Sequence, residues 1–208
     1  SSFKIAYLRD DNSLGYKTVE AHEKAVGYIS CGSAITSYAR NFTIRTAQKN
    51  YHPNGKGFIY ADTDSIHCNL PIDQIVGAKL DKAEFCCWKH ESTWDKAIFV
   101  RQKTYIEHVI AEDEKPIEHP YYNVKCAGMP ANCKDLFMKS MSGFVLDGRP
   151  LTEEQQKEVE KMSDDYKEFL KTERTIEDFK EGLVVPGKLM PKRIPGGVVL
   201  KSSTYEMR

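Results

Sequence analysis

The sequence has little that would place the protein in a membrane or outside a cell. Its longest apolar stretches are only a few residues long, far below the ~20 needed to cross a bilayer. The opening "SSFKIAYLRD" has no signal-peptide pattern. With 208 residues, of which 40% are hydrophobic, the chain can bury the core of one or two domains. We therefore expect a soluble, globular, cytoplasmic protein, and because there is no initiating Met we interpret Ser1 as the start of a piece.

Paired cysteine motifs are also absent. None of the six cysteines forms a CxxC pair, whereas structural zinc sites use paired spacings. Adjacent Cys86 and Cys87, with His90 nearby, leave a partial zinc ligand set as one reading. We favour the other reading, which is free buried thiols in a reducing compartment.

A net charge is missing as well, since thirty Lys and Arg balance thirty Asp and Glu. The charges are unevenly spread, because residues 152–181 hold eleven acidic and six basic side chains. The rest of the chain therefore has a basic excess, and a basic surface there remains compatible with nucleic acid.

The first part of the chain predicts a hairpin and then a helix. "FKIAYLRDDNSLGYKTVE" alternates on both sides of the polar cluster 9–13, which is typical of two strands and a loop, and we expect an exposed β-hairpin arm. From residue 28 to 49 the pattern becomes helical. Apolar side chains then recur at spacings of three and four on one face: Ile35, Tyr38, Ala39 and Phe42.

The middle of the chain is rich in β-type residues. The run "FIYADTDSIHCNL" (58–70) is followed by a segment, Ile72 to His90, that we interpret as a second helix. Three further β-rich stretches, "KAIFVRQ", "TYIEHVI" and "YYNVKCAG", come after it. Together with the opening hairpin they predict an α+β fold, an antiparallel sheet with helices packed on one face.

The last third begins with a helix signal. Thr152 is expected to cap a helix and Gln155 to complete a capping box, before an apolar stripe of Val159, Met162, Tyr166 and Phe169. The tail "PGKLMPKRIPGGVVLKSSTYEMR" is rich in Pro, Gly and Lys. It predicts loops and short strands at the edge of a smaller domain.

Asp62 and Asp64 are the residues with the clearest chemical implication. Apolar residues lead into and out of "DTDS", so it lies where a hairpin must turn, and both carboxylates can project from its tip. Two such carboxylates repel each other unless a cation lies between them. Magnesium prefers hard oxygen ligands and commonly binds one or two carboxylates together with substrate phosphates. The alternative reading is an ordinary Asp turn that bonds its own backbone.

The motif "YADTDS" resembles the third palm motif of family B DNA polymerases. More narrowly, "HESTWDKAIFVRQKTYIE", "VKCAGM" and "IPGGVVL" resemble the protein-primed phage polymerases of the phi-29 type. The matches run in the same order from about Tyr7 to the C-terminus and are weakest between Ala131 and Arg174.

The resemblance implies a β-hairpin arm over 1–27, a palm over 28–129 and a small mixed thumb over 130–208 with an extra acidic helical element. It implies two Mg²⁺ or Mn²⁺ ions, with Asp64 as metal ligand and Asp62 as its supporting partner. The residues expected near the primer are Tyr60, Lys103, Tyr105 and Lys125.

The implied activity is DNA-directed DNA polymerisation with deoxynucleoside triphosphates on a DNA primer-template, with a terminal priming protein as a further partner. The exonuclease, the first palm motif and the fingers motif have no match here, so we expect the chain alone to be inactive. The alternative is a stand-alone nucleic-acid-binding module without catalysis.

Overall fold

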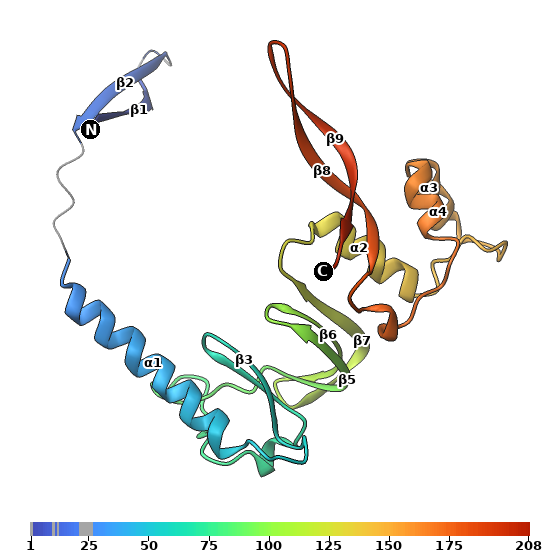
Figure 1. Cartoon of the computed structure of the whole chain (residues 1–208). Helices are drawn as coiled ribbons and strands as arrows, with labels where there is room; N and C mark the ends of the chain where they lie inside the picture. The colour runs from blue at the N-terminus through green and yellow to red at the C-terminus, as the bar shows by residue number, and fades with distance from the viewer. Residues whose placement is uncertain (1, 10, 12, 21–26) are drawn as a thin grey trace. The chain divides into compact units, whose positions relative to one another are not determined.

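The computed structural model of this chain describes residues 2–9, 11, 13–20 and 27–208 (Figure 1). The chain divides into two compact units, Ser1–Asn69 and Leu70–Arg208, and each is described by itself. Small antiparallel sheets and a few helices make up both, so the predicted mixture of antiparallel sheet and helix is confirmed. None of the described helices is long and apolar enough to span a membrane.

The first unit opens with the expected hairpin. Strands β1 (Ser2–Leu8) and β2 (Leu14–Glu20) pair along their whole length. The backbone N–H of Arg9 donates to the carbonyl of Ser13 across the loop, at 2.9 Å. The Ser13 hydroxyl donates to the Asp11 carboxylate, and so does the backbone N–H of Ser13. These two bonds lower the pKa of the Asp11 carboxyl. Residues 1, 10, 12 and 21–26 of the predicted arm lie outside the described part.

Helix α1 (Ile29–Lys49) follows, as the periodicity predicts. The apolar face indicated by the periodicity is not the side of the helix that is buried. Its buried residues are Thr43, Thr46 and Ala47 near the C-terminal end, where α1 packs against β3 (Phe58–Asp62) and β4 (Ser65–Cys68). The predicted apolar stripe is exposed instead: Ile35, Tyr38, Ala39 and Phe42.

A tight connection joins α1 to β3. Asn50 is 1% exposed, and its side-chain amide donates to the carbonyl of Thr46 at 2.8 Å. The carbonyl of Asn50 accepts from the N–H of Phe58 at 2.8 Å. Gly57 has a φ of 100° there, and a Cβ on it would lie 2.0 Å from the Asn50 carbonyl oxygen. Only glycine fits this close approach.

The predicted helix over Ile72 to His90 is wrong. The structure has one short 3₁₀ turn, η1 (Ile72–Gln74), and the rest of the segment is irregular. Gly77 and Cys86 both have positive φ, which interrupts a right-handed helix. The Asp81 carboxylate accepts from two successive backbone N–H groups, a turn that competes with helix formation.

The three β-rich runs form the three-stranded sheet of the second unit. Strands β5 (Ser92–Arg101), β6 (Thr104–Glu112) and β7 (Lys115–Cys126) pair antiparallel in that order. The prediction of one sheet that includes the opening hairpin is wrong. Among the described residues, β1 and β2 pair only with each other, in a separate sheet.

The end of the chain covers one face of this sheet. Helix α2 (Ala131–Met141) and a long hairpin of β8 (Val184–Ile194) and β9 (Gly197–Glu206) surround a common core, with η2 (Ile176–Asp178) before β8. Strands of 11 and 10 residues replace the short strands expected. The side chains without exposure in this core include Phe137, Leu170, Phe179, Val185 and Met207.

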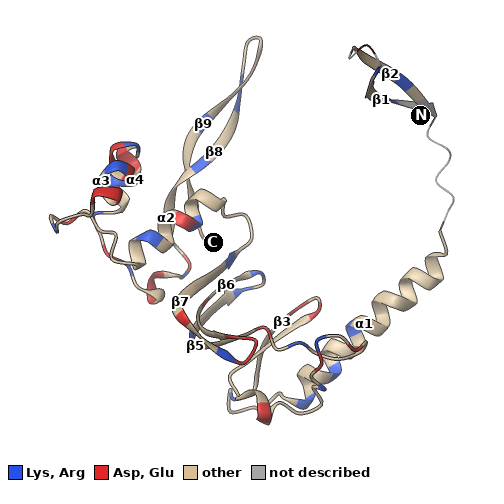
Figure 2. Cartoon of the chain, turned by 180° about the vertical axis from the view of Figure 1, so that it is seen from behind, with Lys and Arg blue, Asp and Glu red and all other residues tan. Residues whose placement is uncertain are grey.

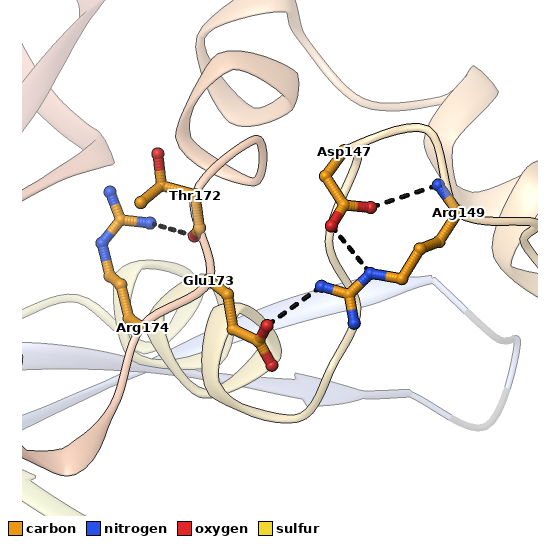
Figure 3. Close-up of polar contacts among 5 residues, drawn as sticks. All are labelled: Asp147, Arg149, Thr172, Glu173 and Arg174. Carbon is orange, nitrogen blue, oxygen red and sulfur yellow. Dashed lines mark hydrogen bonds and ion pairs between the residues drawn. The ribbon is translucent and has the colours of Figure 1, made fainter.

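An extra segment lies between α2 and the hairpin. It contains α3 (Glu153–Glu160) and α4 (Asp164–Phe169), and the predicted capping box of Thr152 and Gln155 is confirmed. Figure 3 shows how its ends are joined, since Arg149 bonds both Asp147 and Glu173. The backbone N–H of Arg149 lowers the pKa of Asp147, and these contacts fix the base of the segment.

Candidate functional site

Asp62 and Asp64 lie at the tip of the β3–β4 hairpin, where the sequence predicts the turn. Asp62 pairs with Ser65, which leaves Thr63 and Asp64 as a two-residue connection. Thr63 has a φ of 54°, and the Asp64 N–H donates to the Asp62 carbonyl at 2.6 Å. Asp64 therefore occupies the turn and not an extended strand, so strand alternation does not set the direction of its side chain.

Polar contacts hold the tip in place. The Thr63 hydroxyl donates to the Asp62 carboxylate at 3.1 Å, and the Ser65 hydroxyl donates to the Asp62 carbonyl at 3.1 Å. The hydroxyl of Thr43, a buried residue of α1, lies 3.3 Å from the Thr63 carbonyl and donates to it. The helix thus anchors the turn that presents the two carboxylates.

The exposure of the two carboxylates fits cation binding. Asp62 is half-buried and Asp64 is exposed, and Figure 2 shows acidic colour at this hairpin tip. No cluster of three or more His, Cys, Asp or Glu side chains suited to a metal occurs in the described part of the chain. The hairpin can therefore offer hard oxygen ligands to Mg²⁺ or Mn²⁺, but other groups must complete the coordination.

Tyr60 lies on the same hairpin, opposite His67 in the β3–β4 register. The two rings lie with centroids 5.5 Å apart and tilted by 46°. Tyr60 is half-buried, so this packing holds its ring on the strand that leads to Asp62.

Tyr105 and Lys125 lie side by side in the second unit. They are directly opposite each other in the register of β6 and β7. The Tyr105 ring stacks on Phe99 of β5, with centroids 5.3 Å apart, and the residue is buried. Lys125 is exposed. One row of the sheet therefore combines two stacked rings with an accessible ammonium group.

Lys103 lies in the turn between β5 and β6, two residues before Tyr105. It has a φ of 57°, its side chain is exposed, and its carbonyl accepts from the N–H of Ala127 at 2.9 Å. Lys103, Tyr105 and Lys125 thus gather at one end of the β5–β7 sheet. Tyr60, Asp62 and Asp64 belong to the other compact unit.

Sequence reasoning missed the row next to Tyr105 and Lys125. Glu107 is only 2% exposed, and the Asn123 side-chain amide donates to its carboxylate at 3.0 Å. The sequence predicts "TYIEHVI" only as a β-rich stretch, which does not single out its charged residue. Its inward direction could have been inferred, because it shares the alternation of Tyr105 and Val109.

The cysteines give no metal site among the described residues. All six are free, and Cys126 and Cys133 are buried. Cys31 and Cys86 are exposed and Cys68 and Cys87 are half-buried, so the prediction of buried thiols is confirmed only for Cys126 and Cys133.

A cavity of about 570 Å³ lies in the second unit between α2, the α3–α4 segment and the β8–β9 hairpin. Leu136, Met162 and Leu189 form apolar parts of its wall, and Lys139 pairs with Glu158 at its edge. The sequence patterns gave no signal for this cavity, because its walls come from segments far apart in the chain.

The chain is similar along its length to DNA polymerases of bacteriophages. It is 31% identical to the DNA polymerase of Bacillus phage phi29 and 32% identical to that of Streptococcus phage Cp-1, over 99% of this chain in each case. It covers 30% and 28% of those two proteins, so the chain spans less than a third of their length. No protein-family model matches it.

Solved structures give the same similarity. Phi29 DNA polymerase complexed with primer-template DNA matches all of this chain, with a TM-score of 0.56 and 30% identity, over 31% of that protein. The ternary complex with DNA and incoming nucleotide substrates matches with a TM-score of 0.55 and 29% identity, again over 31% of that protein. The resemblance to phi29-type DNA polymerases expected from the motifs is therefore confirmed.

Proposed function

Since the chain is similar from end to end to part of the phi29-type DNA polymerases, we propose that it forms the palm and thumb portion of a DNA-directed DNA polymerase. The observation that carries this proposal is the similarity over 99% of the chain, which includes the carboxylate hairpin. The proposed divisions are a β-hairpin arm over 1–27, a palm over 28–129 and a thumb over 130–208.

Asp62 and Asp64 are the proposed metal-binding residues. Two Mg²⁺ or Mn²⁺ ions bound at such a site stabilise the attacking and leaving oxygens of a phosphoryl displacement. Asp64, exposed in the turn, offers its carboxylate as a ligand. Asp62 supports it from the end of β3, where the Thr63 hydroxyl bonds its carboxylate. Incoming nucleotide phosphates supply the ligands that the hairpin lacks.

Lys103, Tyr105 and Lys125 are the proposed primer-binding residues, with Tyr60 on the floor of the palm. The two exposed ammonium groups can neutralise primer phosphates, a contact that does not depend on sequence. Tyr105 is buried against Phe99, which fixes the ring in place beside Lys125, and its hydroxyl is the group proposed to bond a primer phosphate.

The proposed partners are primer-template DNA, deoxynucleoside triphosphates and a terminal priming protein, in the cytoplasm of a bacterial host. We expect the isolated chain to be inactive. The chain spans less than a third of its relatives, and its described residues lack a group of three metal-binding side chains that would complete an ion site.

This lack also favours a second candidate function for the isolated chain. In that function it is a nucleic-acid-binding module without catalysis, and Asp62 and Asp64 are an ordinary turn. This second function would be supported if the chain bound DNA and the parent protein bound DNA equally well with and without a divalent metal ion.

Primer extension separates the two candidates. The polymerase that carries this sequence is assayed with Mg²⁺ and compared with its Asp64→Asn and Asp73→Asn variants. Asp73 is the matched control, because it is an exposed aspartate in η1 and belongs to the other compact unit. We expect Asp64→Asn to reduce extension by roughly 10²-fold or more, as for other losses of transition-state electrostatics, and Asp73→Asn to leave it unchanged. Undiminished extension by Asp64→Asn would contradict the proposal.

A further inference from the structure

We propose that Glu107 is a positioning residue for primer binding, which acts through Asn123 to hold Lys125 beside Tyr105. This inference rests on the proposed function, since it assumes that Tyr105 and Lys125 contact the primer. The observation behind it is the hydrogen bond between Asn123 Nδ2 and Glu107 Oε2, 3.0 Å long, one row away from the proposed primer residues.

The register of the sheet sets out two neighbouring rows. In one row Phe99, Tyr105 and Lys125 lie across β5, β6 and β7. In the next row Ala97, Glu107 and Asn123 do the same. Residues two apart on a strand point to the same face, so both rows belong to one face of the sheet. Glu107 is thus a diagonal neighbour of Lys125, at a typical Cα separation of ~7–8 Å.

Burial distinguishes Glu107 from an ordinary strand residue. It is 2% exposed, between buried Ile106 and half-buried His108. Removing a carboxylate from water is unfavourable unless hydrogen bonds compensate, and apolar residues in such a position are often at least as stabilising. A carboxylate here is therefore better explained by what it holds than by stability alone.

Asn123 is the group that Glu107 holds. A bond from an amide to a carboxylate is stronger than one between two neutral groups. It joins side chains of β6 and β7 next to the pair Tyr105 and Lys125, and β6–β7 shows a register shift only further along, between Val109 and Ala111. A slip of one residue would turn Lys125 to the opposite face. The bond therefore fixes the register where the exposed lysine must face the same side as Tyr105.

The test measures binding of primer-template DNA to this chain by fluorescence anisotropy over a range of salt concentrations. Glu107→Leu removes the acceptor, whereas Glu107→Gln keeps an oxygen that can accept from Asn123. Positioning predicts that Glu107→Leu weakens binding by about fivefold or more and that Glu107→Gln stays within about twofold. If Glu107 acted only through its negative charge, both variants would remove the same repulsion of DNA, and both would bind DNA more tightly. Equally tighter binding by the two variants would therefore overturn the proposal.

A double-mutant cycle with Lys125→Ala gives the second readout. Alone, Lys125→Ala should reduce the slope of log affinity against log salt by about 0.9. On the Glu107→Leu background it should have a smaller effect, since the lysine is already displaced. Additive effects would overturn positioning but leave the primer contact in place. No effect of Lys125→Ala alone, or no binding by the unaltered chain, would overturn the proposed primer contact itself.

Two controls separate this result from a loss of folding. Glu112→Leu changes an exposed glutamate of the same strand, one that bonds the Tyr121 hydroxyl, and should leave DNA binding within about twofold. Asn123→Leu removes the donor from the other strand and should reproduce the loss seen with Glu107→Leu, even if Glu107→Leu itself does not fold. Normal binding by a folded Asn123→Leu variant would contradict the proposal.

Discussion

The core around α2 and the β3–β4 hairpin are built in opposite ways. The core buries Phe137, Leu170 and Phe179 completely and includes residues of the sheet and of the β8–β9 hairpin. The β3–β4 hairpin has strands of five and four residues, no fully buried side chain, and a tip held by hydroxyl groups. Stability is therefore concentrated in the core, whereas the proposed chemistry lies in a part that contributes little to it.

Truncation of a core ring should have the largest effect on stability. Phe137→Ala removes a ring with no exposure that packs on Phe179, with centroids 5.8 Å apart. We expect the free energy of unfolding, measured with urea, to fall by about 3–5 kcal/mol. Phe85→Ala is the matched control, since Phe85 is 95% exposed, and it should change stability by less than about 0.5 kcal/mol. Equal effects of the two variants would show that the core is not where stability resides.

Gly187→Ala should have the next largest effect. Gly187 has a φ of 110°, and a Cβ on it would lie 2.3 Å from the Tyr166 hydroxyl and 2.8 Å from the Asn132 amide nitrogen. The substitution adds backbone strain and displaces the Tyr166 and Asn132 side-chain ends, which are hydrogen-bonded to each other. We therefore expect the free energy of unfolding, measured with urea, to fall by about 2–3 kcal/mol.

Gly182→Ala isolates the strain alone. Gly182 has a φ of 87°, with open space where its Cβ would be. The free energy of unfolding of Gly182→Ala should be lower by about 1 kcal/mol. A Gly187→Ala variant no less stable than Gly182→Ala would mean that α4 does not pack on β8 as described.

Alkaline pH should weaken the core through Tyr205. Its hydroxyl lies 3.2 Å from the Cys126 sulfur, and burial together with that bond raises the pKa of Tyr205 to about 12. Below pH 10 the tyrosine is neutral in both states, so its contribution to stability is complete. As the pH rises from 10 to 12 the unfolded chain loses the proton first, and stability should fall by up to roughly 2 kcal/mol.

This part of the pH dependence should disappear in Tyr205→Phe, when urea unfolding is compared at pH 9 and pH 11. Tyr38→Phe, at a tyrosine that is 75% exposed, should retain it. A Tyr205→Phe variant with the full alkaline loss would assign the effect to other groups.

Asp64→Asn should have the smallest effect on stability. Asp64 is exposed, and the backbone N–H of the same residue, which the substitution keeps, makes the bond to Asp62. We expect the free energy of unfolding, measured with urea, to change by less than about 0.5 kcal/mol. A loss comparable to that of Phe137→Ala would end the separation of chemistry from stability.

Local patterns predicted the elements whose signals are complete within a short stretch. The turn at "DTDS", helix α1, the three strands of the sheet and the Thr152 capping box are of this kind. The segment over Ile72 to His90 was predicted wrongly because Gly77 and Cys86 take positive φ and Asp81 forms a turn.

Three features depended on partners that the sequence does not show. The length of the β8–β9 hairpin was missed because Pro191 and Gly187 are poor strand formers, yet a two-stranded ribbon with a register shift next to Gly187 accommodates both. The alternation of its strand points Glu107 inward, but how deeply it is buried depends on the neighbouring strands, which the sequence does not show. The apolar stripe of α1 was assigned to the wrong environment for the same reason.

Manganese binding by this chain tests the central claim, that Asp62 and Asp64 form a cation site, most directly. Electron paramagnetic resonance can follow free Mn²⁺ during titration of the unaltered chain, the double variant Asp62→Ala, Asp64→Ala, and the control Asp73→Ala. We predict weak binding by the unaltered chain and the control, stronger binding when a deoxynucleoside triphosphate supplies phosphate oxygens, and none by the double variant. Unchanged Mn²⁺ binding by the double variant would contradict the account.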